Sequence, residues 1–157
     1  MAEDPNAELS RAEYWDKRYG SSEPTAATYD WLRNFNTIKP FLTKYLPHAS
    51  TNPEIVHMGN GNSTLPADLL SLDYTKQTAT DFSAVVIDNM RAKHPDVEWR
   101  VMDIRSLEFD DASFDIAIDK ATLDAMLYGS LWDPEDEVKE NVRRYVDEKE
   151  VLPEWVL

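Results

Sequence analysis

The 157-residue sequence contains no cysteine, which excludes disulfide bonds and metal sites built on thiolates. No apolar run approaches the roughly 20 residues that a membrane-spanning helix needs, although 42% of the residues are hydrophobic. The first eight residues are acidic and polar, unlike a secretory signal or an arginine-rich transit peptide. We therefore expect a soluble, cytoplasmic protein with one domain, a substantial core and no contact with a membrane.

Basic side chains are scarce. The 16 lysines and arginines are outnumbered by 30 aspartates and glutamates, which gives a net charge of −14. Nucleic-acid-binding proteins usually carry the opposite sign because they neutralise phosphates, so we expect no nucleic acid as a partner. A negative surface favours encounters with cationic proteins, and a basic protein is the expected substrate or partner. The alternative is that the charge only keeps the protein soluble.

A short apolar run over residues 55–58 ends in Gly59, Asn60 and Gly61, and small polar residues then lead to a helix-like segment at Leu65. This order predicts a strand, a tight turn with outward-facing backbone amides, and a helix N-terminus. Such a turn binds anionic or hydroxyl-rich ligands. Gly-x-Gly turns also occur without any ligand, so the stretch needs support from the rest of the chain.

Apolar periodicity predicts alternating helices and strands in a domain over residues 13–157, preceded by a flexible arm over residues 1–12. The predicted helices cover residues 13–19, 37–46, 65–72, 84–94 and 134–148, with Thr37 and Ser83 as caps. The predicted strands cover residues 54–58, 76–80, 97–101 and 114–118. This alternation indicates the α/β class, with a mostly parallel sheet and helices on both faces.

Three successive strands are followed by an aspartate, namely Asp81, Asp103 and Asp119. Ligands of open parallel sheets bind beyond the carboxyl ends of the strands, so these side chains are expected near the glycine turn. Carboxylates gathered at one edge repel one another, and a ligand with hydrogen-bond donors would help to hold them there.

The spacing of these residues favours a ligand that contains ribose. Asp81 lies 20 residues after Gly61, the spacing at which an acidic residue accepts hydrogen bonds from ribose hydroxyls. Thr64 occupies the third glycine position of the dinucleotide fingerprint, which disfavours a pyrophosphate cofactor and hence a nicotinamide-dependent reductase. S-adenosylmethionine, which is cationic and carries ribose and adenine, fits better. Asp81 is then expected at the ribose and Asp103 at the adenine amino group.

Six segments occur in an order that resembles the eukaryotic methyltransferase-like group containing lysine methyltransferases of a translation elongation factor and of citrate synthase. They are Tyr14–Tyr19, Tyr29–Trp31, Met58–Ser63, Asp81–Ser83, Met102–Ile104 and Asp119–Ala125. The similarity spans about residues 13–147, and the aromatic block together with the Asp-Lys-x-Thr-Leu-Asp segment makes it specific. It implies a Rossmann-like class I methyltransferase that binds S-adenosylmethionine and methylates protein lysine.

The resemblance also implies a role for each matching residue. Three aromatics close over the cofactor, the glycine turn approaches its amino-acid end, and the strand ends contact the ribose and adenine. In that order these residues are Trp15, Tyr19 and Trp31, then Gly59, Asn60 and Gly61, then Asp81 and Phe82 at the ribose, Asp103 and Ile104 at the adenine, and Lys120 beside the cofactor. The alternative for the aromatics is core packing. Asp119 and Asp124 are candidates for a general base, and no catalytic residue is assigned.

The main departure from the family is length. The family fold has seven strands, whereas this chain ends soon after the helix that follows the fourth predicted strand. The alternative function is therefore a catalytically impaired, shortened methyltransferase-like protein that binds cofactor or a partner protein in a regulatory role. The fourth strand is expected to leave an open edge. This edge predicts a homodimer unless residues 151–157 cover it.

Overall fold

Helices and strands alternate along the computed structural model, which describes residue 4 and residues 6–21, 31–148 and 155–156. In chain order they are η1 (Ala7–Ser10), α1 (Ala12–Ser21), α2 (Phe35–Tyr45), η2 (Ala49–Thr51), β1 (Ile55–Met58), α3 (Leu65–Leu70), β2 (Gln77–Asp81), α4 (Ala84–Lys93), β3 (Glu98–Val101), β4 (Ile116–Asp119), α5 (Thr122–Met126), α6 (Asp136–Asp147) and β5 (Trp155–Val156). None of the described helices is long and apolar enough to cross a membrane.

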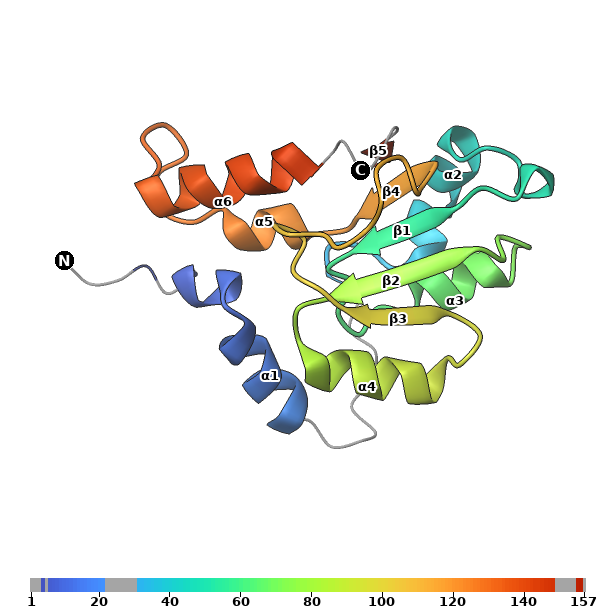
Figure 1. Ribbon diagram of the computed structural model, residues 1–157, viewed down its shortest axis with the longest axis horizontal. Helices are drawn as coiled ribbons and strands as arrows, with labels where there is room; N and C mark the ends of the chain where they lie inside the picture. Colours follow the sequence, from blue (N-terminus) through green and yellow to red (C-terminus); the bar gives the residue numbers. More distant parts are fainter. Residues whose placement is uncertain (1–3, 5, 22–30, 149–154, 157) are drawn as a thin grey trace.

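The central strand of the sheet is β1, in the strand order β3-β2-β1-β4-β5. All pairings are parallel, and Ile55 of β1 lies opposite Gln77 of β2 and Ile116 of β4. The four residues of β1 are buried, as expected for a strand covered on both faces. The carboxyl ends of the strands point toward α1 and α5 (Figure 1). The predicted α/β class with a parallel sheet is confirmed.

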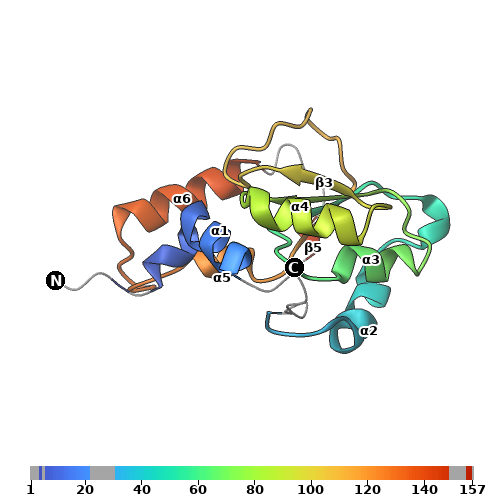
Figure 2. The same ribbon diagram turned by 90° about the horizontal axis from the view of Figure 1, so that it is seen from below.

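Alternate residues of each strand point to opposite faces of the sheet, and both faces are covered by other parts of the chain. Ile55 packs with Leu42 of α2 and Leu69 of α3, whereas Val56 packs with Tyr145 of α6. Figure 2 shows α2 and α3 on one side of the sheet and the connection from β3 to β4 on the other. On the first side, α4 packs on β3 and α1 packs on α4. This arrangement leaves the carboxyl ends of the strands facing α1, η1 and α5.

Local capping sets the helix starts. Ser83 accepts a hydrogen bond from the Val86 N–H and caps α4, as predicted. The start of α2 is earlier than predicted, because Asn34 rather than Thr37 is the cap. The side chain of Asn34 accepts a hydrogen bond of 3.1 Å from the Thr37 N–H.

Two short segments differ from the sequence prediction. The sequence does not predict α5, because five residues are too few for a helical period to show. It predicts a flexible arm over residues 1–12, but η1 lies within this range, with Ala7 and Ser10 buried. Asp4 accepts a hydrogen bond of 3.0 Å from the Gly129 N–H. This part of the arm therefore packs on the connection between α5 and α6.

The edge of β4 is covered by the chain itself. β5 pairs with β4, and Ala117 lies opposite Trp155 and Ile118 opposite Val156. The C-terminal segment therefore occupies this edge through Trp155 and Val156. Residues 151–154 and 157 of the segment lie outside the described part. The sequence predicts a homodimer through this edge only if the edge is open, and in the described residues β5 occupies it. The described residues form five strands, against seven in the family fold.

A histidine lies inside the central strand. His57 is 2% exposed, and its Nε2 lies 2.8 Å from Oε1 of Gln77. The Gln77 amide nitrogen donates to two backbone carbonyls, so Oε1 is an acceptor and Nε2 carries the proton. Nδ1 is buried without a hydrogen-bond partner among the described residues. Burial lowers the pKa of His57 to about 4.

This pKa predicts a loss of stability in acid. The unfolded histidine binds a proton near pH 6.5 and the folded one only near pH 4, so the unfolded state binds more protons between these values. The free energy of unfolding should therefore fall as the pH is lowered through this window, by about 3 kcal/mol in total from His57. In urea titrations at several pH values, His57→Gln should flatten this dependence. His48→Gln, the same exchange at an exposed position, is the matched control, and equal slopes in both variants would contradict the prediction.

Candidate functional site

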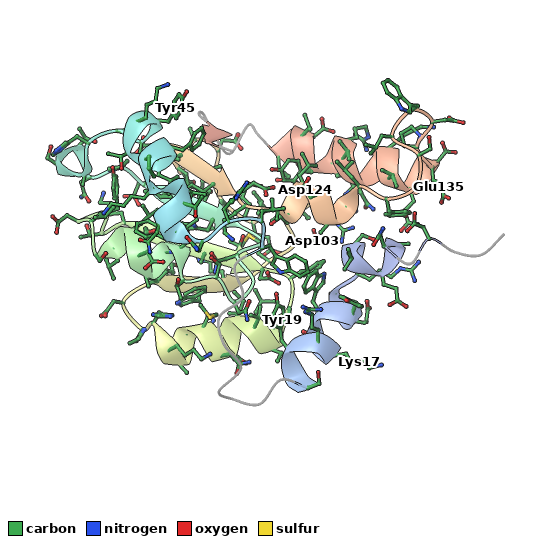
Figure 3. The ribbon with its side chains drawn as sticks, turned by 180° about the vertical axis from the view of Figure 1, so that it is seen from behind. Lys17, Tyr19, Tyr45, Asp103, Asp124 and Glu135 are labelled. Atoms are coloured by element: carbon green, nitrogen blue, oxygen red, sulfur yellow. The ribbon has the colours of Figure 1, made fainter. Side chains whose placement is uncertain are left out.

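A pocket lies where the carboxyl ends of β1 to β4 face η1, α1 and α5, and its volume is about 190 Å³. The structure brings every residue that was predicted to contact a cofactor to this pocket. They are Trp15, Tyr19, Trp31, Gly59, Asn60, Gly61, Asp81, Phe82, Asp103, Ile104 and Lys120. In Figure 3, Tyr19, Asp103 and Asp124 lie around the same central region, whereas Tyr45 lies far out on α2.

Aromatic side chains form one wall of the pocket. Trp15 stacks on Tyr19 with ring centroids 5.7 Å apart and meets Trp31 edge-on at 5.9 Å. The Arg18 guanidinium lies over both tryptophan rings, 5.3 Å from the centroid of Trp31. Trp15 also donates its indole N–H to the Leu9 carbonyl at 2.7 Å. Because Trp15 and Tyr19 are buried and also line the pocket, the two roles considered for the aromatics, core packing and pocket wall, are combined.

The glycine turn uses its backbone amides inside the protein. The Asn60 N–H donates to the Thr80 carbonyl at 2.8 Å, and the Ser63 N–H donates to the Asn60 carbonyl at 3.3 Å. The Gly61 N–H donates to Oδ2 of Asp81 at 2.9 Å. The prediction that the amides of the turn point outward to a ligand is therefore wrong for these residues. A pyrophosphate would find these donors occupied, in agreement with the incomplete dinucleotide fingerprint.

Both glycines adopt the left-handed backbone, with φ of +64° at Gly59 and +55° at Gly61. A Cβ on Gly59 would collide with Thr122, whose hydroxyl donates to the carbonyls of Met58 and Gly59. A Cβ on Gly61 would lie 2.7 Å from the hydroxyl oxygen of Tyr19. Gly59 therefore lets α5 pack on the turn, and Gly61 lets the aromatic wall approach it.

Asp81, the last residue of β2, carries a carboxylate that is almost fully buried, with the residue 5% exposed. Its Oδ1 accepts from the Ser83 N–H and its Oδ2 from the Gly61 N–H, both at 2.9 Å. Burial raises the pKa of Asp81 to about 6; the charge of Asp16 adds to this effect, and the two amide bonds oppose it. A carboxylate has about four acceptor positions, so these two bonds leave room for a ligand hydroxyl.

Asp103 follows β3 by two residues and is bound by Arg105. Nε and Nη2 of Arg105 donate to the carboxylate at 2.9 and 2.8 Å, and the backbone N–H of Arg105 donates at 2.9 Å. Burial alone would raise the pKa of Asp103, but the hydrogen bonds and positive charge of Arg105 outweigh it and lower the pKa. Asp103 is therefore an ionised acceptor whose charge is balanced within the chain.

Lys120 joins the end of β4 to the aromatic wall, because its Nζ donates to the Trp31 carbonyl at 3.0 Å. Lys120 lines the pocket, and its place beside a cofactor stays a prediction; the bond to Trp31 is not one that the sequence indicates. The family segment that contains Trp31 begins with Tyr29 and Asp30, which lie outside the described residues.

The two base candidates have different surroundings. Oδ1 of Asp119 accepts from the Thr122 N–H at 2.8 Å, and Oδ2 accepts from the Leu123 N–H at 3.1 Å. Oδ2 also accepts from the Tyr145 hydroxyl at 2.8 Å. Asp119 thus caps α5 and does not line the pocket, whereas Asp124 is exposed and lines it. Of the two, only Asp124 is placed to meet a substrate.

Several residues line the pocket without being predicted from the sequence, among them Leu9, Ser10, Arg105 and Thr122. For Arg105, the one signal in the sequence is its position two residues after Asp103, which could have identified it as a pocket residue. The residues of η1 carry no such signal, because their segment has no hydrophobic period.

The pocket combines flat aromatic walls, the buried acceptor Asp81 and two cationic side chains, Arg105 and Lys120. This set suits a ligand with a planar ring and hydroxyl groups. In the part of the chain that the structure describes, no group of three or more His, Asp or Glu side chains could hold a metal ion.

Curated proteins that are similar to this chain include lysine methyltransferases. Mouse EEF1A lysine methyltransferase 4 is 33% identical over 127 residues, which cover 79% of this chain and 48% of the relative. Human eEF1A lysine and N-terminal methyltransferase is 30% identical over 145 residues, which cover 90% of this chain and 20% of the relative. The chain thus spans about half the length of the first relative and a fifth of the second.

Solved structures show the same fold. A structure from echinomycin biosynthesis, concerned with the conversion of a disulfide bond into a thioacetal group, has a TM-score of 0.63 at 18% identity and covers 87% of this chain and 53% of its own. Phosphoethanolamine N-methyltransferase 1 of Haemonchus contortus, in complex with phosphoethanolamine and S-adenosylhomocysteine, has a TM-score of 0.53 at 18% identity and covers 76% of this chain and 26% of its own.

Residues 55–147, more than half of the chain, match the methyltransferase domain family. The match runs from the first residue of β1 to the last residue of α6, so it includes the glycine turn and the three strand-end aspartates. The sheet order and the covering helices agree with it. The chain therefore belongs to the methyltransferase family and has its class I, Rossmann-like fold.

Proposed function

We propose that this protein is an S-adenosylmethionine-dependent methyltransferase that acts on the side-chain amine of a lysine in a basic protein. The observation that carries the proposal is the pocket at the strand ends, which gathers all the residues that the resemblance assigns to the cofactor. The family of the chain and the lysine methyltransferase names of its relatives support it. The cytoplasmic location predicted from the sequence is part of the same proposal.

The residues of the pocket fit S-adenosylmethionine chemically. Asp81 would accept hydrogen bonds from the ribose hydroxyls, because its carboxylate keeps free acceptor positions. Phe82 would supply apolar surface beside the ribose and Ile104 beside the adenine ring, and Asp103 would supply an acceptor for the adenine amino group. When bound, the cofactor supplies a methyl group on a sulfonium. The chain itself aligns the acceptor amine with that group and excludes water.

The size of the pocket requires some movement on binding. Its volume of about 190 Å³ is below the roughly 300–1,000 Å³ of most small-molecule sites. Leu32 lines the pocket, is 70% exposed and has a φ of +64°, which is unfavourable for a bulky side chain. Relief of this strain would favour a change in the Leu32 backbone when a nucleoside-sized ligand enters.

The acceptor lysine must be neutral to react, and its ordinary pKa is about 10.4. Proton removal therefore needs either burial of the amine or a base at the pocket. Asp124 remains the candidate for the base, because it is exposed at the pocket. The carboxylate of Asp119 instead accepts hydrogen bonds from the first amides of α5.

The raised pKa of Asp81 predicts that cofactor binding depends on pH. The carboxylate accepts hydroxyl donors best when ionised, and its pKa is about 6. In calorimetric titrations with S-adenosylmethionine, the Kd should therefore be constant above pH 7 and rise up to about tenfold per pH unit below pH 6. Asp81→Asn should bind about 10- to 100-fold more weakly at pH 7.5, because a bond to a charged acceptor is lost, and its Kd should no longer follow the pH between 5 and 7.

Asp88→Asn is the matched control for this experiment. The same exchange on α4 alters an exposed carboxylate that pairs with Arg91, away from the pocket, so its Kd should follow that of the parent. No binding of S-adenosylmethionine by the parent protein would overturn the proposed function. A parent Kd that stays constant from pH 7 to pH 5 would contradict the assignment of Asp81 to the ribose.

Methyl transfer is expected in addition to binding. With isotopically labelled S-adenosylmethionine, the protein should label lysine side chains of basic proteins in a lysine-rich lysate. Amino-acid analysis of the labelled proteins identifies methyl-lysine. Binding without any transfer would instead indicate the regulatory role considered from the sequence.

An exposed apolar surface supports a protein substrate. Leu131 and Trp132 lie in the connection between α5 and α6, and Trp132 is 99% exposed. The acidic residues Asp133, Glu135 and Asp136 follow them and are also exposed. Tryptophan is enriched among the residues that dominate protein interfaces, and the acidic neighbours favour a basic partner. We assign this surface, Leu131–Asp136, to the basic substrate.

Replacement of Trp132 should therefore weaken use of the protein substrate alone. Trp132→Ala should raise the KM for the basic protein about tenfold or more and leave the Kd for S-adenosylmethionine unchanged, because the side chain does not line the pocket. Tyr45→Ala, which removes an exposed aromatic ring from α2, is the matched control and should leave both values unchanged. Equal KM values for the two variants would show that the Leu131–Asp136 surface does not bind the substrate.

A further inference from the structure

Helix α6 contacts two of the strand-end aspartates from outside the pocket, Asp119 directly and Asp103 through Arg105. Asn141 and Tyr145 lie four residues apart, so they share one face of the helix, and both are buried. Tyr145 donates its hydroxyl to Asp119 at 2.8 Å. Asn141 accepts a hydrogen bond of 2.9 Å from Nη1 of Arg105, the residue that binds Asp103. Neither Asn141 nor Tyr145 lines the pocket.

Arg105 therefore bridges Asn141 to Asp103. Its Nε and Nη2 are directed at the carboxylate of Asp103, and its Nη1 is directed at Oδ1 of Asn141. The guanidinium is planar and rigid, so fixing Nη1 also fixes the plane in which the other two donors lie. The orientation of the Asp103 carboxylate thus depends on a residue of α6 that is 36 positions away from Arg105 in sequence.

Burial of the Asn141 amide is unfavourable. The residue is 6% exposed, and its Nδ2 is buried without a hydrogen-bond partner among the described residues. A buried, unsatisfied amide is unfavourable, and an apolar side chain of similar volume would avoid this penalty. The favourable contact that the Asn141 side chain makes is the one with Arg105. This points to a role in orienting Arg105 rather than in stabilising α6.

We propose that Asn141 is a positioning residue which, through Arg105, holds the carboxylate of Asp103 in the orientation that selects the amino group of adenine. This inference rests on the proposed function. Adenine presents an N–H donor at its sixth position, whereas hypoxanthine presents an oxygen there, which would face the oxygens of Asp103 without a hydrogen. A fixed Asp103 therefore discriminates between the two bases, and a carboxylate that is free to turn away discriminates less.

The test compares two ligands that differ only at this group, S-adenosylhomocysteine and S-inosylhomocysteine, in calorimetric titrations of the full chain. The parent should prefer the adenosine form by about 10- to 100-fold, the value of one hydrogen bond to a charged group. Asn141→Leu should reduce this preference at least fivefold. Its melting temperature should change by no more than about 4 °C, because loss of the Arg105 contact is offset by removal of the unsatisfied amide.

Two further variants separate positioning from a structural role. Asn141→Asp keeps an acceptor for Arg105 and should restore most of the preference for the adenosine form. Tyr145→Phe removes a different buried hydrogen bond of α6, the one with Asp119, and should lower the melting temperature without changing the preference. If Asn141→Leu does not fold, Asn141→Ala provides the same test, because it also removes the acceptor for Nη1 of Arg105.

The possible outcomes are distinguishable. A preference that is unchanged in folded Asn141→Leu overturns the inference and leaves the proposed function intact. An equal weakening of both ligands also overturns it, because it indicates a structural role for Asn141. If the parent binds neither ligand, the proposed function and the inference fail together. A reduced preference that Asn141→Asp restores supports the assignment.

Discussion

The buried carboxylate of Asp81 is the interaction on which the site depends. It joins the end of β2 to the glycine turn through the Gly61 N–H and to the start of α4 through the Ser83 N–H. Burial of this charge is unfavourable, as its raised pKa indicates, and the backbone N–H groups of Ser83 and Gly61 oppose this effect. Because these donors are used by a carboxylate of the protein, they are not available to a phosphate, and an acceptor is presented instead.

Much of the arrangement could be predicted from the sequence, because it depends on local order. Each strand has its own apolar pattern, and in a parallel sheet all carboxyl ends lie at one edge. Residues placed directly after strands, such as Gly61, Asp81 and Lys120, are therefore brought together by topology alone. The resemblance added the aromatic residues, which no strand end would have indicated. This is why all the predicted residues line a single pocket.

The partners of those residues could not be predicted, because they are set by contacts between distant elements. The sequence does not show that Thr122 packs on Gly59 or that Tyr145 reaches Asp119. The predicted outward direction of the amides in the turn is wrong for the same reason, since their acceptors lie on β2 and in the turn itself. The short elements η1 and α5 were missed because four or five residues hold too little of a helical period.

The three strand-end aspartates show how the protein solves the repulsion expected of gathered carboxylates. Asp81 is held by backbone amides, Asp103 by a guanidinium, and Asp119 by the first turn of α5 together with a tyrosine. Their pKa values differ accordingly, being raised for Asp81 and Asp119 by burial and lowered for Asp103 by Arg105. Donors of the chain itself thus hold all three carboxylates, so the help that was expected from a ligand is not required for this. Of these three aspartates, Asp81 and Asp103 line the pocket, so one strand-end carboxylate that faces a ligand is paired with Arg105 and the other titrates near pH 6.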